Sequence, residues 1–467
     1  MTQNTLAFQA RAHGTSSAVL ALGLLAGAAL AGCASEPPRI EPPVPRLLGA
    51  SLSAYSAPEA AGSAARRTQL PEEPKGAITL RDALAAALLG NPDLAAFSWE
   101  IRVREARALQ AGLLPNPELA IEVENLGGSG DFSGADQAET TLALGQLIEL
   151  GGKRMKRRRV AELDAMLAGW DYEARRVEVF AEVTRAFAEL LVAQERLRLS
   201  DELLGLAEKS LNSVTRQVRA GAASPVERTR AEVTLATQTL ERRSAEAELA
   251  AARVRLAGTW GGRKALYEKA EGDLFAVASP PTREEILERL DENPELARWV
   301  QEIELRKAVV ALEDARRAPN LVASAGMRRL EESNDTALVF GVSMPLQVFD
   351  RNQGARLAAQ RDLTKVRHQR MAVEVGVQTS LEVVIQELAA SYQEVVTLRE
   401  QVLPKAERAY RDVRQGYLRG LFRYLDVLDA QRSLFELRSR ELDALRAYHS
   451  AVAEVERLTG TPIRGRP

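Results

Sequence analysis

Side chains that usually carry chemistry are scarce in this sequence. It holds one cysteine, Cys33, and three histidines, His13, His368 and His449. One cysteine excludes an intramolecular disulfide, and histidines this far apart give no cluster with metal-ligand spacing. The sequence also contains no glycine-rich phosphate loop and no nucleophile elbow. We therefore expect no enzyme, no tightly bound metal and no cofactor held by the fold.

Excess charge and aromatic residues are scarce as well. The 467 residues carry a formal net charge of -2, and aromatic residues make up 5%. Proteins that bind nucleic acid are normally strongly basic, so that role is not expected. Ala, Leu, Glu, Arg and Val dominate instead, and this composition favours long helices over a mixed globular core.

The first 32 residues have the pattern of a secretory signal peptide. Arg11 precedes an apolar run at residues 18–30, and Ala31 and Gly32 stand directly before Cys33. Such a run is too short for a stable membrane-spanning helix. The Leu-Ala-Gly-Cys ending resembles the bacterial lipobox, which implies cleavage before Cys33 and a lipid on its thiol. Ala34, in place of an Asp, implies the outer rather than the inner membrane.

Residues 33–77 read as a lipidated N-terminus followed by a tether. Proline fixes the backbone and removes an amide donor, so this stretch is expected to be extended and not packed as a helix. The prolines that punctuate it are Pro37, Pro38, Pro42, Pro43, Pro45, Pro58, Pro71 and Pro74.

The rest of the chain reads as two copies of one unit, at residues 78–262 and 283–460. A linker at 263–282 separates them, and a tail follows at 461–467. Four motifs recur in the same order about 200 residues later, among them Asn91-Pro92-Asp93-Leu94 as Asn293-Pro294-Glu295-Leu296. Such self-similarity is the mark of a repeat architecture.

Each copy has the same predicted helices. The apolar spacing predicts a first helix at 80–114 and 283–316, a very long one at 153–220 and 352–419, and a returning one at 224–257 and 423–458. The long helices carry a coiled-coil seam. Pro404 and Gly205 stand at matching places in them, so a kink or break is expected in both.

Between the first two helices of each copy lie two segments of alternating polarity. Each segment has about 9 to 11 residues, which is enough for a tilted strand to cross a membrane. The alternation equally fits a small soluble sheet with one wet face. A sheet inside lipid must close into a barrel, and small barrels need about eight strands or more. Four strands are too few, so in that case several chains would share one barrel.

These parts resemble the TolC-like outer membrane factors from residue 78 to residue 461. Within that family, Gln146-Leu147-Ile148-Glu149-Leu150-Gly151-Gly152-Lys153-Arg154 resembles the heavy-metal efflux branch of the CzcC type. The resemblance implies a mainly α fold with a small β part. Three chains would form an α-helical barrel continuous with a twelve-stranded transmembrane β-barrel, four strands coming from each chain.

The resemblance also implies the function and the partners. The chain would be the outer-membrane channel of a tripartite efflux system, a passive duct for heavy-metal cations that is held in outer-membrane lipid and extends into the periplasm. Its partners would be a periplasmic adaptor (membrane fusion) protein and an inner-membrane, proton-driven pump of the RND type. Two alternatives stay open: a duct for drugs or type I secreted proteins, and a periplasmic adaptor or structural lipoprotein.

Site residues carried over by the resemblance lie at the periplasmic tip. Asp426 and Asp429 would point inward as stacked acidic rings, which repel one another and attract cations. For Asp426, capping of the returning helix is the alternative. The remaining tip residues are the predicted latch and the turn glycines: Tyr417, Glu227, Arg423, Gly221 and Gly420.

A run of cations at residues 153–159 begins the first long helix. Cations there oppose the helix dipole, so an anionic partner such as lipid headgroups would stabilise them. A solvated helix face explains the run equally well.

Overall fold

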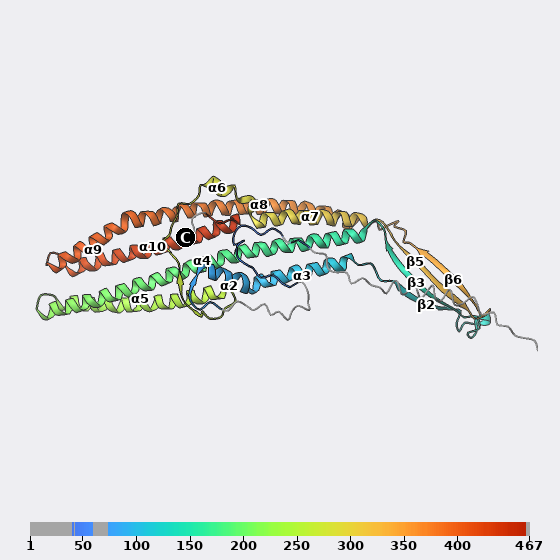
Figure 1. Ribbon diagram of the computed structural model, residues 1–467, viewed down its shortest axis with the longest axis horizontal. Helices are drawn as coiled ribbons and strands as arrows, with labels where there is room; N and C mark the ends of the chain where they lie inside the picture. The colour runs from blue at the N-terminus through green and yellow to red at the C-terminus, as the bar shows by residue number, and fades with distance from the viewer. Residues whose placement is uncertain (1–39, 42, 59–72, 464–467) are drawn as a thin grey trace, which may run out of the picture.

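The computed structural model describes residues 40–41, 43–58 and 73–463. Figure 1 shows an elongated molecule in which helices occupy most of the length and a small sheet forms one end. The predicted signal peptide and Cys33 lie outside the described residues. Within them, the expectation of a mainly α protein with a small β part is confirmed.

The element order repeats, as the sequence predicted. One copy has a helix, two strands, a very long helix and a returning helix, and the second copy has the same parts in the same order. The first copy consists of α3 (Pro92–Gly112), β2 (Glu118–Glu124), β3 (Glu139–Glu149), α4 (Lys153–Arg219) and α5 (Pro225–Gly258). The second consists of α7 (Pro294–Ala315), β5 (Asn320–Leu330), β6 (Asp335–Ser343), α8 (Gln353–Thr397) with α9 (Leu403–Leu418), and α10 (Tyr424–Thr459).

The first predicted helix of each copy is in fact two helices, so that prediction was wrong. Helix α2 (Leu80–Gly90) ends before α3, and α6 (Arg283–Leu287) with a 3-10 turn (Leu290–Glu292) precedes α7. The cause is the Asn-Pro pair at each break. Proline disfavours the helical region for the residue before it, and Asn91 is accordingly extended at φ -66° and ψ 121°.

The two asparagines at these breaks make the same two hydrogen bonds. The Asn91 Oδ1 accepts from the Leu94 amide at 2.9 Å, and its Nδ2 donates to the Thr259 carbonyl at 2.8 Å. In the second copy, Asn293 accepts from Leu296 at 2.8 Å and donates to the Leu458 carbonyl at 2.7 Å. Each asparagine thus caps one helix and ties it to the end of the returning helix.

The long helices differ between the copies. Helix α4 is continuous for 67 residues, about 100 Å at 1.5 Å per residue. The predicted break at Gly205 is wrong, because glycine keeps its amide and only weakens a helix by about 1 kcal/mol. The break at Pro404 is confirmed: a π-helical turn (Leu398–Val402) separates α8 from α9. Proline has no amide to donate, so the regular hydrogen-bond ladder cannot pass through it.

Helix α4 lies at the centre of the helical body. Toward the sheet it packs between α3 and α7, and toward the opposite end it packs against α5 and α10. The buried core follows it as a series of clusters. One cluster joins α4 to other elements of the first copy and contains Phe180, Val183 and Leu190. Another joins α4 to α10 and contains Val192, Leu199 and Leu445.

Part of the predicted tether is packed on the body. The Leu48 side chain is 1% exposed, and its amide donates to the Gly460 carbonyl at 3.0 Å. The buried pair Arg176 and Glu173 of α4 holds the same segment, because Arg176 donates to the Leu48 carbonyl and Glu173 accepts from the Arg46 amide. The segment is not helical, as predicted, but it turns at residues 47–52 and is fixed to both copies.

A second small sheet joins the tether to the linker between the copies. Strand β1 (Gly76–Thr79) pairs in parallel with β4 (Tyr267–Glu271). The sequence analysis missed both strands, because runs of four and five residues are too short to show a clear alternation.

The main sheet confirms all four predicted strands. They are antiparallel in the order β2-β3-β5-β6, so β3 and β5 join the two copies at the centre. Gly326 of β5 lies opposite Ala143 of β3, and a Cβ at Gly326 would stand 2.3 Å from the Leu142 carbonyl oxygen. The two strands approach so closely here that only glycine fits.

Replacing Asn91 with alanine removes both the helix cap and the bond to the Thr259 carbonyl. We expect Asn91→Ala to lower the free energy of unfolding by about 1–2 kcal/mol. Thermal unfolding at one scan rate, followed by circular dichroism, measures the change. Asn212→Ala, on the exposed surface of α4, is the control. Equal midpoints for the two variants would contradict the role given to Asn91.

Replacing Gly326 with alanine forces a methyl group against the backbone of β3. We expect Gly326→Ala to cost roughly 1–3 kcal/mol, the range for overpacked sites. The lost stability is measured as a lower temperature at which the folded protein stops migrating as folded protein on a semi-native gel. Gly145→Ala is the matched control, because a Cβ at Gly145 meets its nearest atom at 3.7 Å. If both variants tolerated heat equally, the close approach would be refuted.

Candidate functional site

The main sheet has two faces of opposite character. One face is apolar yet open: Leu119 is 66% exposed, Ile121 67%, Phe340 76% and Val342 73%. Residues directly opposite on antiparallel strands share a face, so the register assigns the second face. That second face also carries Leu147, Val322, Leu330 and Val339, but most of its side chains are small or charged, among them Glu118, Ala120, Glu122, Glu124, Glu139, Thr141, Ala143, Gly145, Ser324, Gly326 and Arg328.

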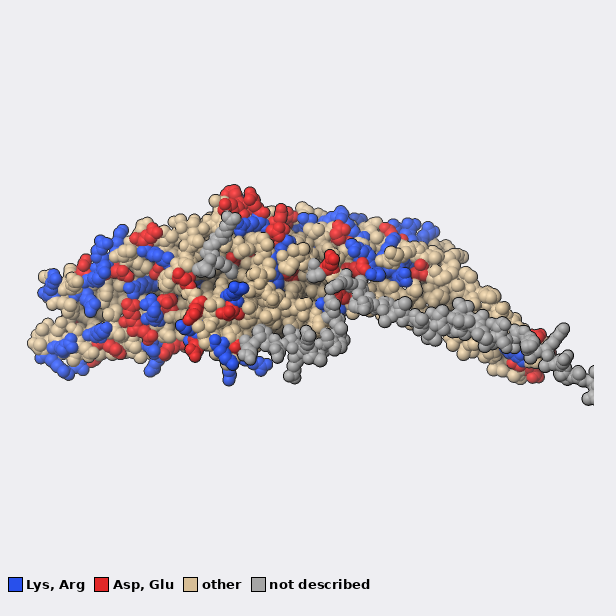
Figure 2. Space-filling view, in the orientation of Figure 1, with Lys and Arg blue, Asp and Glu red and all other residues tan. Residues whose placement is uncertain are grey.

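The distribution of charge matches this division. Figure 2 shows lysine, arginine and acidic side chains scattered over the helical body, while the visible part of the sheet is nearly free of them until its far tip. A contiguous apolar surface of this kind on one chain marks a membrane or protein interface. An apolar outer face with a polar inner face is the pattern of a membrane β-strand.

The edges of the sheet are open within this chain. Among the described residues, strands β2 and β6 each pair with one neighbour only, so no described strand lies beside their outer backbone amides and carbonyls. Exposed edges pair readily with another chain, and in lipid each unpaired group costs several kcal/mol. The two edges of this sheet are therefore suited to pairing with another chain.

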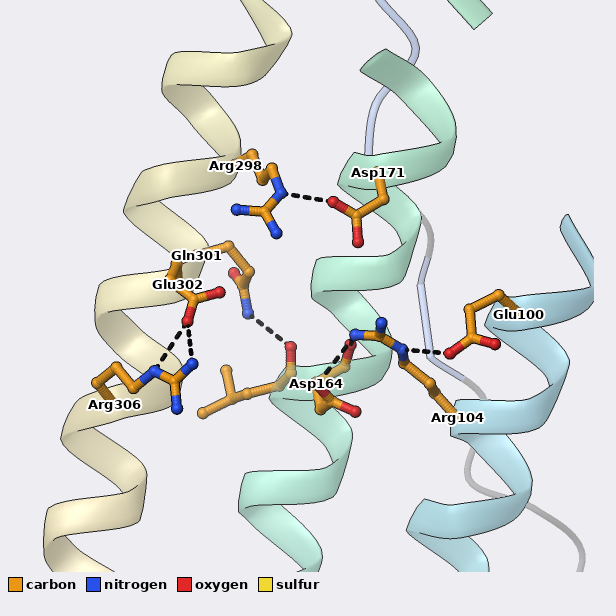
Figure 3. A network of polar contacts seen from close by, with 9 residues as sticks. Glu100, Arg104, Asp164, Asp171, Arg298, Gln301, Glu302 and Arg306 are labelled. Carbon is orange, nitrogen blue, oxygen red and sulfur yellow. Dashed lines mark hydrogen bonds and ion pairs between the residues drawn. The ribbon is translucent and has the colours of Figure 1, made fainter. Parts of the chain in front are cut away.

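The helices next to the sheet are joined into a wall by ion pairs. Figure 3 shows Arg104 of α3 and Arg298 of α7 reaching α4 from opposite sides. Arg104 lies 3.0 Å from Asp164, and Arg298 lies 2.5 Å from Asp171. One more pair, from Arg306 to Asp362 at 3.2 Å, continues the series from α7 to α8. Four helices in a row are thus tied edge to edge.

The Gln146–Arg154 stretch builds the junction between the sheet and α4. Gly151 and Gly152 have positive φ, 74° and 69°, which turns the chain from β3 into the helix. Gln146 donates to the Pro115 carbonyl at 3.0 Å, and Arg157 forms a two-pronged pair with Glu149 at 2.6 and 3.1 Å. Arg157, which belongs to the basic run, is thus paired within the chain. Arg154, in the same run, is exposed.

The opposite end of the body is formed by two helical hairpins. Gly221 follows α4 and Gly420 follows α9, with φ of 70° and 77°, so the structure places both predicted glycines in the tight turns. Ser224 caps α5 by accepting from the Val226 amide at 3.3 Å. The left end of Figure 1 shows the two hairpin tips side by side.

Two tyrosines connect the hairpins. The Tyr417 hydroxyl donates to the Gln217 side chain at 2.6 Å, and the Tyr424 hydroxyl accepts from Ser210 at 2.9 Å. Burial raises the pKa of Tyr417, and the charge of Glu227 raises it further. Glu227 is therefore near Tyr417, but the hydrogen bond within this chain goes to Gln217. The predicted bond from Tyr417 to Glu227 stays a prediction.

Gln217, Ser210 and Tyr424 were not identified from the sequence. A buried tyrosine hydroxyl needs a partner, and Tyr424 is 2% exposed. That requirement could have singled out Tyr424 as a residue facing another helix. It could not have named Ser210, which is 214 residues away in the chain.

The two predicted aspartates begin α10. The Asp426 carboxylate accepts from the Arg423 amide at 2.8 Å, so it serves as the helix cap considered as its alternative role. Arg423 is an exposed side chain 4.0 Å from that carboxylate. Asp429, one turn later, is exposed and lines a groove between α10 and the α4–α5 hairpin. Their arrangement as rings in an assembly stays a prediction.

The part of the chain that the structure describes lacks two other kinds of site. Within residues 40–41, 43–58 and 73–463, no helix is long and apolar enough to cross a membrane. In the same part of the chain, no three His, Cys, Asp or Glu side chains gather as a metal site. His449 lies with Nε2 2.9 Å from the Leu274 carbonyl.

Comparison with known proteins matches these features. Residues 83–262 and 286–461 match the family described as outer membrane efflux protein, and the two segments coincide with the two copies. The cobalt-zinc-cadmium resistance protein CzcC of Cupriavidus metallidurans is 36% identical over 390 residues, 84% of this chain and 92% of CzcC. The nickel-cobalt-cadmium resistance protein NccC of Alcaligenes xylosoxydans xylosoxydans is 27% identical over 294 residues, 63% of this chain and 65% of NccC.

Solved structures have the same fold. CusC, studied for folding and transmembrane channel formation, superposes with a TM-score of 0.70 at 16% identity, covering 91% of this chain and 99% of CusC. At that identity the likeness concerns the fold alone. The TolC-like fold expected from the sequence is thereby confirmed. With both copies matched over most of the chain, this protein belongs to the outer membrane efflux protein family.

Proposed function

We propose that this chain is the outer-membrane channel component of a tripartite efflux system of the RND type, a passive duct that carries heavy-metal cations to the exterior. The observation that carries the proposal is the amphipathic sheet continued by helices that extend about 100 Å away from it. The names of CzcC and NccC, which concern cobalt, zinc, nickel and cadmium, support the class of cargo.

The working unit in this proposal is a trimer. Four strands per chain fall below the roughly eight that a small membrane barrel needs, and three chains supply twelve. The open edges of β2 and β6 then pair between neighbours, and the apolar face contacts outer-membrane lipid. The wall of α3, α4, α7 and α8 repeats around the same axis as a helical barrel. The duct has no chemistry of its own.

The hairpin tips are the periplasmic end of the duct. Three copies of Asp426 and Asp429 form acidic rings that attract cations, and Tyr417, Glu227 and Arg423 hold neighbouring hairpins together. The turns at Gly221 and Gly420 set how closely the hairpins approach. This end meets the periplasmic adaptor protein and, through it, the inner-membrane pump.

The N-terminus adds a lipid anchor. A lipid on Cys33, the only group that the chain would carry covalently, inserts in the outer membrane, and residues 33–77 connect it to the body. Because residues 43–58 pack on both copies, the anchor is joined to a fixed part of the body. Lipid chains hold a protein less firmly than an inserted spanning element does, so the barrel carries most of the membrane attachment.

The proposal is tested first by single-channel conductance in a planar bilayer. We expect cation-selective currents from the wild type. In Asp426→Asn/Asp429→Asn, the preference for cations should fall about fivefold, since one unit charge at about 4 Å contributes ~1 kcal/mol in water. Asparagine also caps helices, so the fold is kept. Asp412→Asn, exposed on α9, is the control. No current from folded, oligomeric protein would refute the duct.

The lipid is tested by metabolic labelling. Cells that express the full chain should incorporate labelled palmitate into it, and Cys33→Ala should abolish the label. The variant protein should still reach the outer membrane as folded oligomer, because the sheet and not the lipid provides most of the attachment. Label retained in Cys33→Ala, or absent from the wild type, would exclude lipidation at Cys33.

A further inference from the structure

Two carboxylates face each other at the far end of the sheet. Glu124 is the last residue of β2 and Glu139 the first of β3, and the register pairs them directly. Like charges directly opposite on neighbouring strands are destabilising. Both lie at the end of the sheet away from the helices, where Figure 2 shows charged side chains reappearing. A nearby cation is needed to hold this pair together.

Arg328 of β5 supplies that cation. Its guanidinium lies 2.8 Å from the Glu139 carboxylate and 3.2 Å from the Glu124 carboxylate. Its Nε donates to the Thr141 hydroxyl at 2.9 Å. All three nitrogens therefore have a partner, and one side chain bridges three strands. A planar guanidinium is suited to this, because its donors are held in a fixed fork.

The register places this bridge on the polar face. Arg328 pairs with Thr141 of β3 and with Ala337 of β6, and all three share the face of Glu124. Leu338, the next residue of β6, belongs to the apolar face and is 65% exposed. Arg329 is also on that side, where it pairs with Glu331 at 3.5 Å. Two adjacent arginines thus lie on opposite faces of one strand.

Resting on the proposed function, we propose that Arg328 sets the electrostatic potential at the outer mouth of the duct. Within this cluster, two carboxylates and one guanidinium leave one net negative charge per chain, and two would remain without Arg328. Glu122 and Asp335 lie on the same face and add to the negative potential. A path for cations must attract them strongly enough to enter and weakly enough to leave. Arg328 meets the second requirement by neutralising one carboxylate and holding both against the wall.

The local potential is measured with thiol reagents. In the full chain in its native membrane, Ala337→Cys is reacted with a cationic and an anionic methanethiosulfonate, and the ratio of the two rates is compared between variants. Arg328→Gln should raise the cationic-to-anionic ratio roughly three- to tenfold, as expected for loss of a unit charge at about 7 Å in water. Arg329→Gln is the matched control and should leave the ratio unchanged.

A second variant separates charge from misfolding. Glu124→Gln removes one negative charge but keeps the Arg328–Glu139 pair, so it should lower the same ratio. A ratio for Arg328→Gln equal to that for Arg329→Gln would overturn the inference, as would a rise in Glu124→Gln. The proposed function fails separately: if Leu338→Cys reacts with these water-soluble reagents as fast as Ala337→Cys, the apolar face does not lie in lipid.

Discussion

The main sheet has two requirements that one chain cannot meet. Its apolar face is open to the surroundings, and among the described residues no strand pairs with the outer backbone groups of β2 and β6. In the proposed trimer, lipid covers the face and pairing between chains satisfies the edges, because nothing in the hydrocarbon layer can hydrogen-bond a backbone amide. The rest of the architecture follows, since a sheet shared between chains fixes the position of every helix that continues it.

The helical body transmits that arrangement over a long distance. Helix α4 is continuous for 67 residues and contacts both copies, so the sheet and the hairpin tips are connected by one rigid element. Ion pairs join neighbouring helices from α3 to α8. The buried Arg176–Glu173 pair of α4 holds the packed part of the tether. Asn91 and Asn293 make matching hydrogen bonds. In both copies these bonds tie the start of α3 or α7 to the end of the returning helix.

Charge is placed at the two ends of this wall. Asp426 and Asp429 lie at the start of α10, and Glu124, Glu139 and Arg328 lie at the far end of the sheet. Between them the polar face of the sheet has small residues such as Ala143, Gly145 and Ser324, beside the carboxylates of Glu118 and Glu122.

Local pattern and chain order determined much of this protein from the sequence alone. Period-two alternation fixed the four long strands, apolar spacing fixed the long helices, and recurring motifs fixed the two copies, because each depends on residues close together in the chain. The Pro404 break follows from a missing amide. If the four strands cross a membrane, every backbone group must be paired, and the sheet must then be shared by several chains.

Only the tertiary structure decided which distant residues meet. The pairing of Tyr417 with Gln217, the bond from Asn91 to Thr259 and the bridge from Arg328 to Glu124 join residues 200, 168 and 204 positions apart. The packing of residues 43–58 and the close approach at Gly326 likewise depend on how elements cross in space. Sequence shows that a buried hydroxyl or a carboxylate pair needs a partner, but three-dimensional packing selects the partner.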